Sequence, residues 1–119
     1  MDSNKLVDRL EFARKLCQGK RVLDIGGQKM PCASGVASAF CKKYAGIQEN
    51  ALDYKILDVQ DVDSVDYILD LNKPQSLDAL RCILLDYRPQ VILCMETLEH
   101  INYHFEVLNI FAEACSRIA

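Results

Sequence analysis

The sequence has little of what a metal centre, a nucleic-acid surface or a membrane anchor requires. It contains two histidines, and none of its six cysteines forms a C-x-x-C pair, so we expect no zinc or other metal site. It has no run of Lys or Arg and its net charge is −3, so we expect no nucleic-acid partner. No apolar run approaches the length of a membrane span, and the N-terminal residues lack the apolar core of a signal peptide.

What is present is the composition of an ordinary globular domain. Of the 119 residues, 50% are hydrophobic and 26% are charged, and this length predicts a single domain over residues 1–119. Several cysteines fall on expected apolar faces, where reduced thiols serve as small hydrophobic side chains. This use of cysteine predicts a reducing, cytoplasmic location.

Hydrophobic periodicity divides the chain into alternating helices and strands. Helices are predicted at 3–18, between 34 and 46, at 76–87 and from 102 to 118, with Gly46 ending the second, residues 47–53 as a loop and Asn102 capping the last helix. Strands are predicted at 21–25, 54–59, 65–71 and 91–95. This order predicts an α/β, doubly wound fold, in which helices cover both faces of a mostly parallel sheet.

The connection between the second and third strands is unusually short. Parallel neighbours normally need a crossover of about a dozen residues or more. Either the third strand is short and begins late, or the two segments do not pair as parallel neighbours.

The first strand runs directly into a glycine turn. Val22, Leu23 and Ile25 form the apolar run of a strand that is covered on both faces. Gly26 and Gly27 follow, and without a Cβ they allow a sharp turn and the close approach of a ligand. In open α/β sheets, ligands bind at this carboxyl edge of the strands.

Each predicted strand ends on or beside an acidic residue, namely Asp24, Asp58, Asp70 and Glu96. Because buried carboxylates need hydrogen-bond donors, this series indicates a ligand rich in donors, such as ribose hydroxyls, an adenine amino group or an ammonium. Two points separate this site from a dinucleotide site. Carboxylates repel phosphate, and the G-x-G-x-x-G fingerprint of dinucleotide sites is absent.

Four segments, in this order along the chain, resemble the S-adenosylmethionine-dependent methyltransferases of the Rossmann-like class. They are Val22–Gly27, Leu57–Val59, Asp70–Pro74 and Val91–His100, the last of which contains an E-x-L-E-H sequence. The resemblance implies a Rossmann-like three-layer sandwich and S-adenosyl-L-methionine as the cofactor.

The resemblance also implies a role for each acid. Asp24, with the glycine turn, would hold the methionine portion of the cofactor. Asp58 would accept hydrogen bonds from the ribose hydroxyls, and Asp70 would contact the adenine together with the backbone of Leu71. Met95 and Glu96 would border the methyl-transfer cleft. The cofactor-binding residues implied in this way are Asp24, Gly26, Gly27, Asp58, Asp70, Leu71, Met95 and Glu96.

The sequence departs from this family at its C-terminal side. The family's sheet has seven strands in the order 3-2-1-4-5-7-6, whereas this chain stops after the helix that follows strand four. We therefore expect the strand order 3-2-1-4. The chain would then correspond to the N-terminal, cofactor-binding half of the family's domain, without the later strands. The apolar strand 91–95 then becomes an edge, which we expect to pair with a second copy or a partner chain.

Three functions follow as hypotheses. The first is a methyltransferase, or its cofactor-binding half, that acts on an unidentified and small or sugar-like acceptor. The second is a catalytically silent methyltransferase-like fragment or partner subunit that works by protein association. The third is an NAD- or nucleotide-binding domain, against which the missing third glycine counts. No residue is singled out as catalytic.

Overall fold

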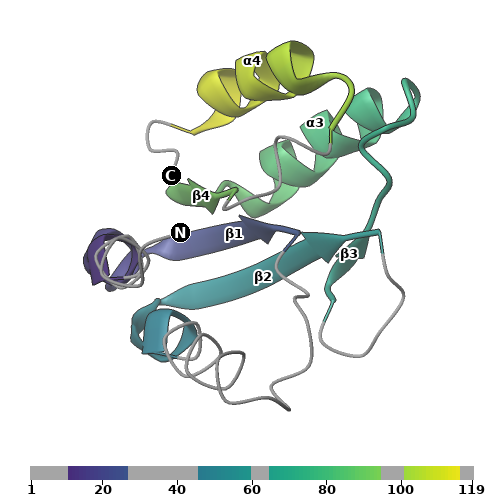
Figure 1. The fold of residues 1–119 in the computed structure, drawn as a ribbon. Coiled ribbons are helices and arrows are strands. Elements are labelled where there is room, and N and C mark those ends of the chain that lie inside the picture. Colours follow the sequence, from purple (N-terminus) through teal and green to yellow (C-terminus); the bar gives the residue numbers. More distant parts are fainter. Residues whose placement is uncertain (1–10, 27–45, 60–64, 95–100, 116–119) are drawn as a thin grey trace, which may run out of the picture.

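The structure is a computed structural model, and it describes residues 11–26, 46–59, 65–94 and 101–115. Within these residues, four parallel strands form one sheet in the order β3-β2-β1-β4 (Figure 1). The strands are β1 (Arg21–Ile25), β2 (Asp53–Asp58), β3 (Tyr67–Ile68) and β4 (Val91–Leu93). The predicted α/β class and the predicted strand order are confirmed.

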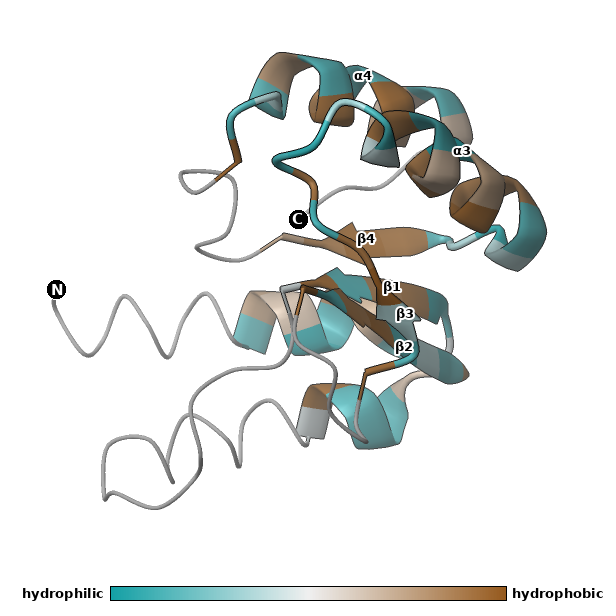
Figure 2. Cartoon of the chain, turned by 90° about the vertical axis from the view of Figure 1, so that its right-hand side faces the viewer, coloured by the Kyte–Doolittle hydropathy of each residue, from teal (hydrophilic) through white to brown (hydrophobic). Residues whose placement is uncertain are grey.

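Helices lie on both faces of the sheet. Helices α3 (Ser76–Tyr87) and α4 (His104–Ala114) cover one face, and the helical residues 11–17 and 46–50 lie on the other (Figures 1 and 2). Figure 2 shows β4 and parts of β1 and β2 as hydrophobic segments between these layers. No helix in the described ranges is both long and apolar enough to cross a membrane.

Strand β1 lies at the centre of the packing because its alternate residues enter two different cores. Leu23 and Ile25 pack with the buried side chains of α3 and α4, whereas Val22 packs on the opposite face with Cys17 and Ile47. All five of these side chains are 0–1% exposed. Burial on both faces explains why three of the five residues of β1 are large and apolar.

Helix α3 has the bounds that its sequence predicts. Leu80 and Leu84, four residues apart, point into the core and are buried. The helix ends at Arg88, which adopts a left-handed backbone conformation and donates its N–H to the Leu84 carbonyl at 2.9 Å. Pro89 follows and cannot continue the helix.

The short connection between β2 and β3 is explained by a short third strand that begins late. Tyr67 pairs with Leu57, so β3 meets only the last two residues of β2. Because β3 starts beside the end of β2, the chain returns along the sheet by only about two strand residues, roughly 7 Å. A return of this length needs no helical crossover. The first of the two alternatives is therefore confirmed.

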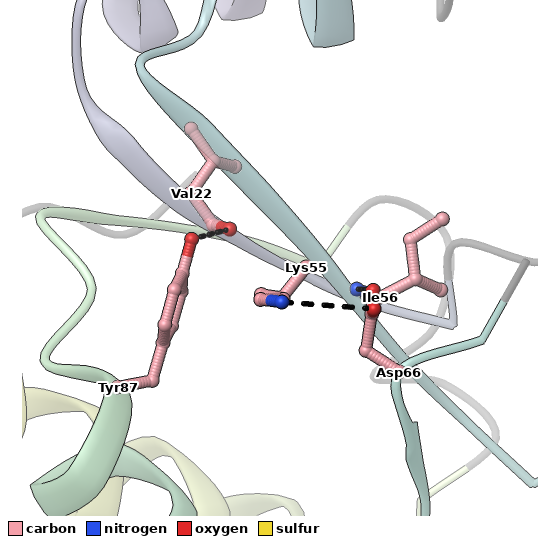
Figure 3. A network of polar contacts seen from close by, with 5 residues as sticks. All are labelled: Val22, Lys55, Ile56, Asp66 and Tyr87. Carbon is pink, nitrogen blue, oxygen red and sulfur yellow. Dashed lines mark hydrogen bonds and ion pairs between the residues drawn. The ribbon is translucent and has the colours of Figure 1, made fainter.

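Asp66 fastens the start of β3 to the middle of β2. Its N–H donates to the Ile56 carbonyl at 2.9 Å, and its carboxylate accepts the Ile56 N–H at 2.8 Å. The same carboxylate lies 3.9 Å from the Lys55 ammonium (Figure 3). These contacts substitute for the longer ladder that a full-length third strand would have formed.

Two predicted helix ends are wrong. Residues 46–50 are helical, so Gly46 does not end a helix, and Ile47 explains this because its side chain is fully buried against the sheet. The second wrong end is the start of the last helix: α4 begins after Tyr103, and Asn102 does not cap it. The main-chain N–H of Asn102 instead donates to Asn72 Oδ1 at 2.7 Å.

Two ionisable side chains are held in the protonated form within the core. Burial raises the pKa of the Cys17 thiol from 9.0 to about 12, and the nearby Asp24 carboxylate adds to this shift. Tyr87 donates its hydroxyl to the Val22 carbonyl at 2.9 Å (Figure 3). Burial, and next the Asp53 carboxylate, raise the pKa of Tyr87.

Alkaline pH is therefore expected to destabilise the chain. In the unfolded chain the Cys17 thiol loses its proton near 9.0, whereas the folded state retains that proton to about 12. The thiol's contribution to the free energy of unfolding is complete below the first value and falls as pH rises through this interval, at up to about 1.4 kcal/mol per pH unit. The raised pKa of Tyr87 lowers the free energy of unfolding further at higher pH. Urea unfolding at a series of pH values measures the effect.

The control for this prediction is Cys17→Ala. This variant loses some stability at neutral pH because it leaves a small cavity. Its additional loss between neutral and alkaline pH should nevertheless be smaller than that of the native chain. Equal losses in the two proteins would contradict the assignment to Cys17.

Candidate functional site

The carboxyl ends of β1, β2 and β3 border one open pocket. Its described part has a volume of about 170 Å³. Its walls are mostly aliphatic, and polar groups come from the strand ends and the turn after β3. The lining residues are Ile25, Gly26, Leu57, Asp58, Val59, Leu69, Asp70, Leu71, Asn72 and Ile101.

Gly26 forms the first wall of this pocket. Its φ of 71° lies in the left-handed region, where a side chain would be strained, so the turn after β1 favours glycine at this position. Its N–H donates to the Leu57 carbonyl at 2.7 Å, which holds the turn against the end of β2. The expected glycine turn is therefore present at Gly26, and Gly27 lies outside the described residues.

Asp58 is the last residue of β2 and is half-buried at the pocket. Its Oδ1 accepts the N–H of Val59 at 2.6 Å, and its main-chain carbonyl accepts the N–H of Leu69 at 2.9 Å. The backbone on both sides thus fixes where this carboxylate stands, at the junction between β2 and β3.

Asp70 and Leu71 follow β3 and line the same pocket. The Asp70 Oδ1 accepts the N–H of Asn72 at 3.0 Å, a local turn that aspartate commonly forms with the residue two positions later. Leu71 is buried in the core. Two of the four acids expected at strand ends, Asp58 and Asp70, are therefore brought together.

Asn72 joins the two chain segments that form this side of the pocket. Its N–H is bound by Asp70, and its Oδ1 accepts the N–H of Asn102 at 2.7 Å. Ile101, next to Asn102, is 6% exposed and lines the pocket. The side chain of Asn72 thus holds the Asp70 turn against the segment before α4.

Asp24 lies elsewhere. It is completely buried and, in β1, faces the same side of the sheet as Val22, two residues earlier. The Tyr54 hydroxyl on β2 donates to its Oδ2. Asp24 does not line the pocket of Asp58 and Asp70, so the structure does not bring the three acids together, and its role toward the methionine portion stays a prediction.

Some expected positions lie outside the described residues, namely Gly27, Met95 and Glu96 of the expected site. Among the residues that the structure does describe, no group of three or more His, Cys, Asp or Glu side chains could hold a metal ion. His104, expected at the surface, is exposed.

Sequence reasoning missed three residues that shape this region. Asn72 and Ile101 line the pocket, and Tyr54 binds Asp24. The Asp-Leu-Asn order at 70–72 is a pattern for a local side-chain turn, so it could have indicated Asn72. No local signal marks Tyr54 or Ile101, because their contacts depend on segments distant in sequence.

The pocket combines aliphatic walls with two carboxylates. Carboxylates accept hydrogen bonds and attract cationic or hydroxyl-bearing groups, while the leucine and isoleucine side chains offer flat apolar contact. This arrangement suits an uncharged or cationic ligand that carries several donors.

A scan of the sequence against protein-family models gives no match, and a search of curated proteins also gives none.

Replacing Asn72 by Ala is expected to lower stability by about 1–2 kcal/mol, because it leaves the Asn102 N–H without its acceptor. Urea unfolding measures this loss. Asn109→Ala is the matched control, since Asn109 is exposed on α4 and its replacement should change stability by about 0.5 kcal/mol or less. Similar losses in the two variants would show that the Asn72 link is not a structural contact.

Proposed function

We propose that the chain binds S-adenosyl-L-methionine and is a methyltransferase, or the cofactor-binding half of one, with a Rossmann-like fold. The observation that carries the proposal is the pocket that Gly26, Asp58 and Asp70 share at the carboxyl edge of the sheet. The strand order β3-β2-β1-β4 supports it, because it is the order of the first four strands that the sequence resemblance implies.

The described pocket suits the adenosine part of this cofactor. Asp58, at the end of β2, would accept hydrogen bonds from the ribose hydroxyls. Asp70 and the backbone of Leu71 would meet the polar edge of the adenine, and Ile101 would supply apolar contact with its ring. Each of these four residues lines the pocket, so one bound nucleoside can reach them all.

The size of the pocket limits what these residues can hold. About 170 Å³ is smaller than the roughly 300–1,000 Å³ of a typical small-molecule site. We therefore assign only the nucleoside part to the described pocket. The positions proposed for the methionine portion and the methyl-transfer cleft, Gly27, Met95 and Glu96, lie outside the described residues.

The charge of the pocket also distinguishes between ligands. When bound, S-adenosyl-L-methionine supplies an electrophilic methyl group, which an acceptor's lone pair takes as the carbon–sulfur bond breaks and sulfur keeps the electron pair. Asp58 and Asp70 would favour its cationic and hydroxyl-bearing groups and would repel the diphosphate of a dinucleotide.

The first experiment is titration calorimetry of the 119-residue chain with S-adenosylmethionine, S-adenosylhomocysteine and NAD. Binding of the first two without NAD is expected. Binding of NAD alone would replace this proposal with a dinucleotide-binding domain. Binding of none of the three would favour the silent module that acts by protein association, for which β4, the outermost strand on its side of the described sheet, is the expected contact.

A second experiment tests the site itself. Asp58→Asn keeps the shape of the side chain and its acceptor for the Val59 N–H but removes the charge, so it should weaken S-adenosylhomocysteine binding by about 10–100-fold. Asp78→Asn is the matched control, since Asp78 is exposed on α3, where it pairs with Arg81 at 3.2 Å. Equal affinities in the two variants would remove Asp58 from the site.

A further inference from the structure

A second pocket lies at the opposite, amino-terminal end of the strands. It has a volume of about 410 Å³ and is lined by Lys20, Arg21 and Arg88, by Pro89 and Gln90, and by Ala114, the last residue of α4, with Cys115 after it. We call it the basic pocket. Arg21 is the first residue of β1 and Lys20 precedes it, and Arg88 comes from the turn between α3 and β4.

The guanidinium of Arg21 is held in a fixed position. Its Nε and Nη2 both donate to the Arg88 carbonyl, at 3.0 and 2.7 Å. The main chain of Arg21 is fixed as well, since its N–H donates to Gln90 Oε1 at 3.0 Å and its carbonyl accepts the Gln90 N–H at 2.8 Å. The remaining N–H groups of a guanidinium held in this way can bind a ligand without first being ordered.

Arg88 has a backbone conformation that glycine adopts more easily. Its φ of 54° and ψ of 63° lie in the left-handed region, and among the described residues it is the one non-glycine residue with positive φ. Such a conformation is unfavourable for a non-glycine residue, and glycine is the usual residue after a helix end. An arginine at this position therefore indicates a use for its side chain, whose contact in the described structure is a 3.3 Å hydrogen bond from Nε to the Leu85 carbonyl.

Acidic side chains within the described ranges do not neutralise the charges of the basic pocket. No carboxylate in the described residues forms an ion pair with Lys20, Arg21 or Arg88, and none lines the pocket. Asp53 pairs with Arg21 in the sheet, but its carboxylate interacts with the Tyr87 hydroxyl and raises the pKa of Tyr87. The C-terminal ends of α3 and α4 contribute about half a negative charge each, so the three cations leave a net charge of about +2.

We propose that the basic pocket binds a small oxyanion of the phosphate or diphosphate type. The two arginines supply planar donors that match phosphoryl oxygens, and Lys20 supplies a mobile ammonium beside them. This site is separate from the pocket of Asp58 and Asp70, which lies at the other end of the strands and repels such a ligand.

Titration calorimetry of the 119-residue chain with inorganic pyrophosphate, at constant ionic strength in sodium chloride, tests the proposal. Saturable binding with a Kd of about 1 mM or lower is expected. Backbone amide shifts in NMR spectra should move at Arg21 and Gln90 and should not move at Gly26 and Asp70. Absence of saturable heat would overturn the proposal, since it indicates only diffuse attraction.

Arg88→Gly separates a ligand-binding role from a structural one. Glycine fits the backbone conformation at this position, so the variant should fold with a Tm close to that of the native chain while pyrophosphate binds about tenfold more weakly. Lys20→Gln should weaken binding in the same direction. Lys15→Gln, on an exposed part of the helical residues 11–17, is the matched control and should bind like the native chain. Equal affinity in all four proteins would overturn the proposal.

Discussion

The structure depends on the parallel pairing of β1 with both of its neighbours. Arg21 to Ile25 pair with β2 along their whole length, and Val22 to Asp24 pair with β4 on the other side. Because both faces of β1 are also buried, it lies between two hydrophobic cores. Parallel pairing forces the carboxyl ends of β1 and β2 to one edge of the sheet and their amino ends to the other, which is how residues far apart in sequence come to share a pocket.

The two ends of the sheet differ in the charge that they present. The carboxyl edge carries Asp58 and Asp70, and the amino edge carries Lys20, Arg21 and Arg88. The net charge of −3 conceals this separation, because it sums residues that are distant in space. A ligand responds to the local charges of the pocket that it enters, and the charged side chains that line these two pockets have opposite sign.

Asp24 illustrates why a series of acids at strand ends need not form one cluster. Alternate residues of a strand face opposite sides of the sheet, so the side chain of Asp24 enters the layer that holds Val22 and Cys17. There it accepts the hydroxyl of Tyr54, a hydrogen bond that makes burial of a carboxylate tolerable. Asp58 ends β2 and Asp70 follows β3, and the two meet at the pocket because β3 pairs with the very end of β2.

The sequence by itself determined the elements whose signals are local. The bounds of β1 and α3 follow from apolar periodicity and from residues that stop an element, such as Gly19, with its φ of 69°, and Pro89. The α/β class and the strand order were also predictable, the order through the family resemblance. In the candidate site, Gly26, Asp58, Asp70 and Leu71 were predicted positions that the structure brings to one pocket.

Only the tertiary structure decided the contacts between distant segments. The length of β3, the bond from Asn72 to Asn102, the partner of Asp24 and the position of Arg88 beside Arg21 all depend on how separate segments are placed against one another. A strand shifted by one residue keeps its composition but turns every side chain to the other face. Composition and periodicity therefore predict which segments pack, whereas register and packing decide which side chains meet.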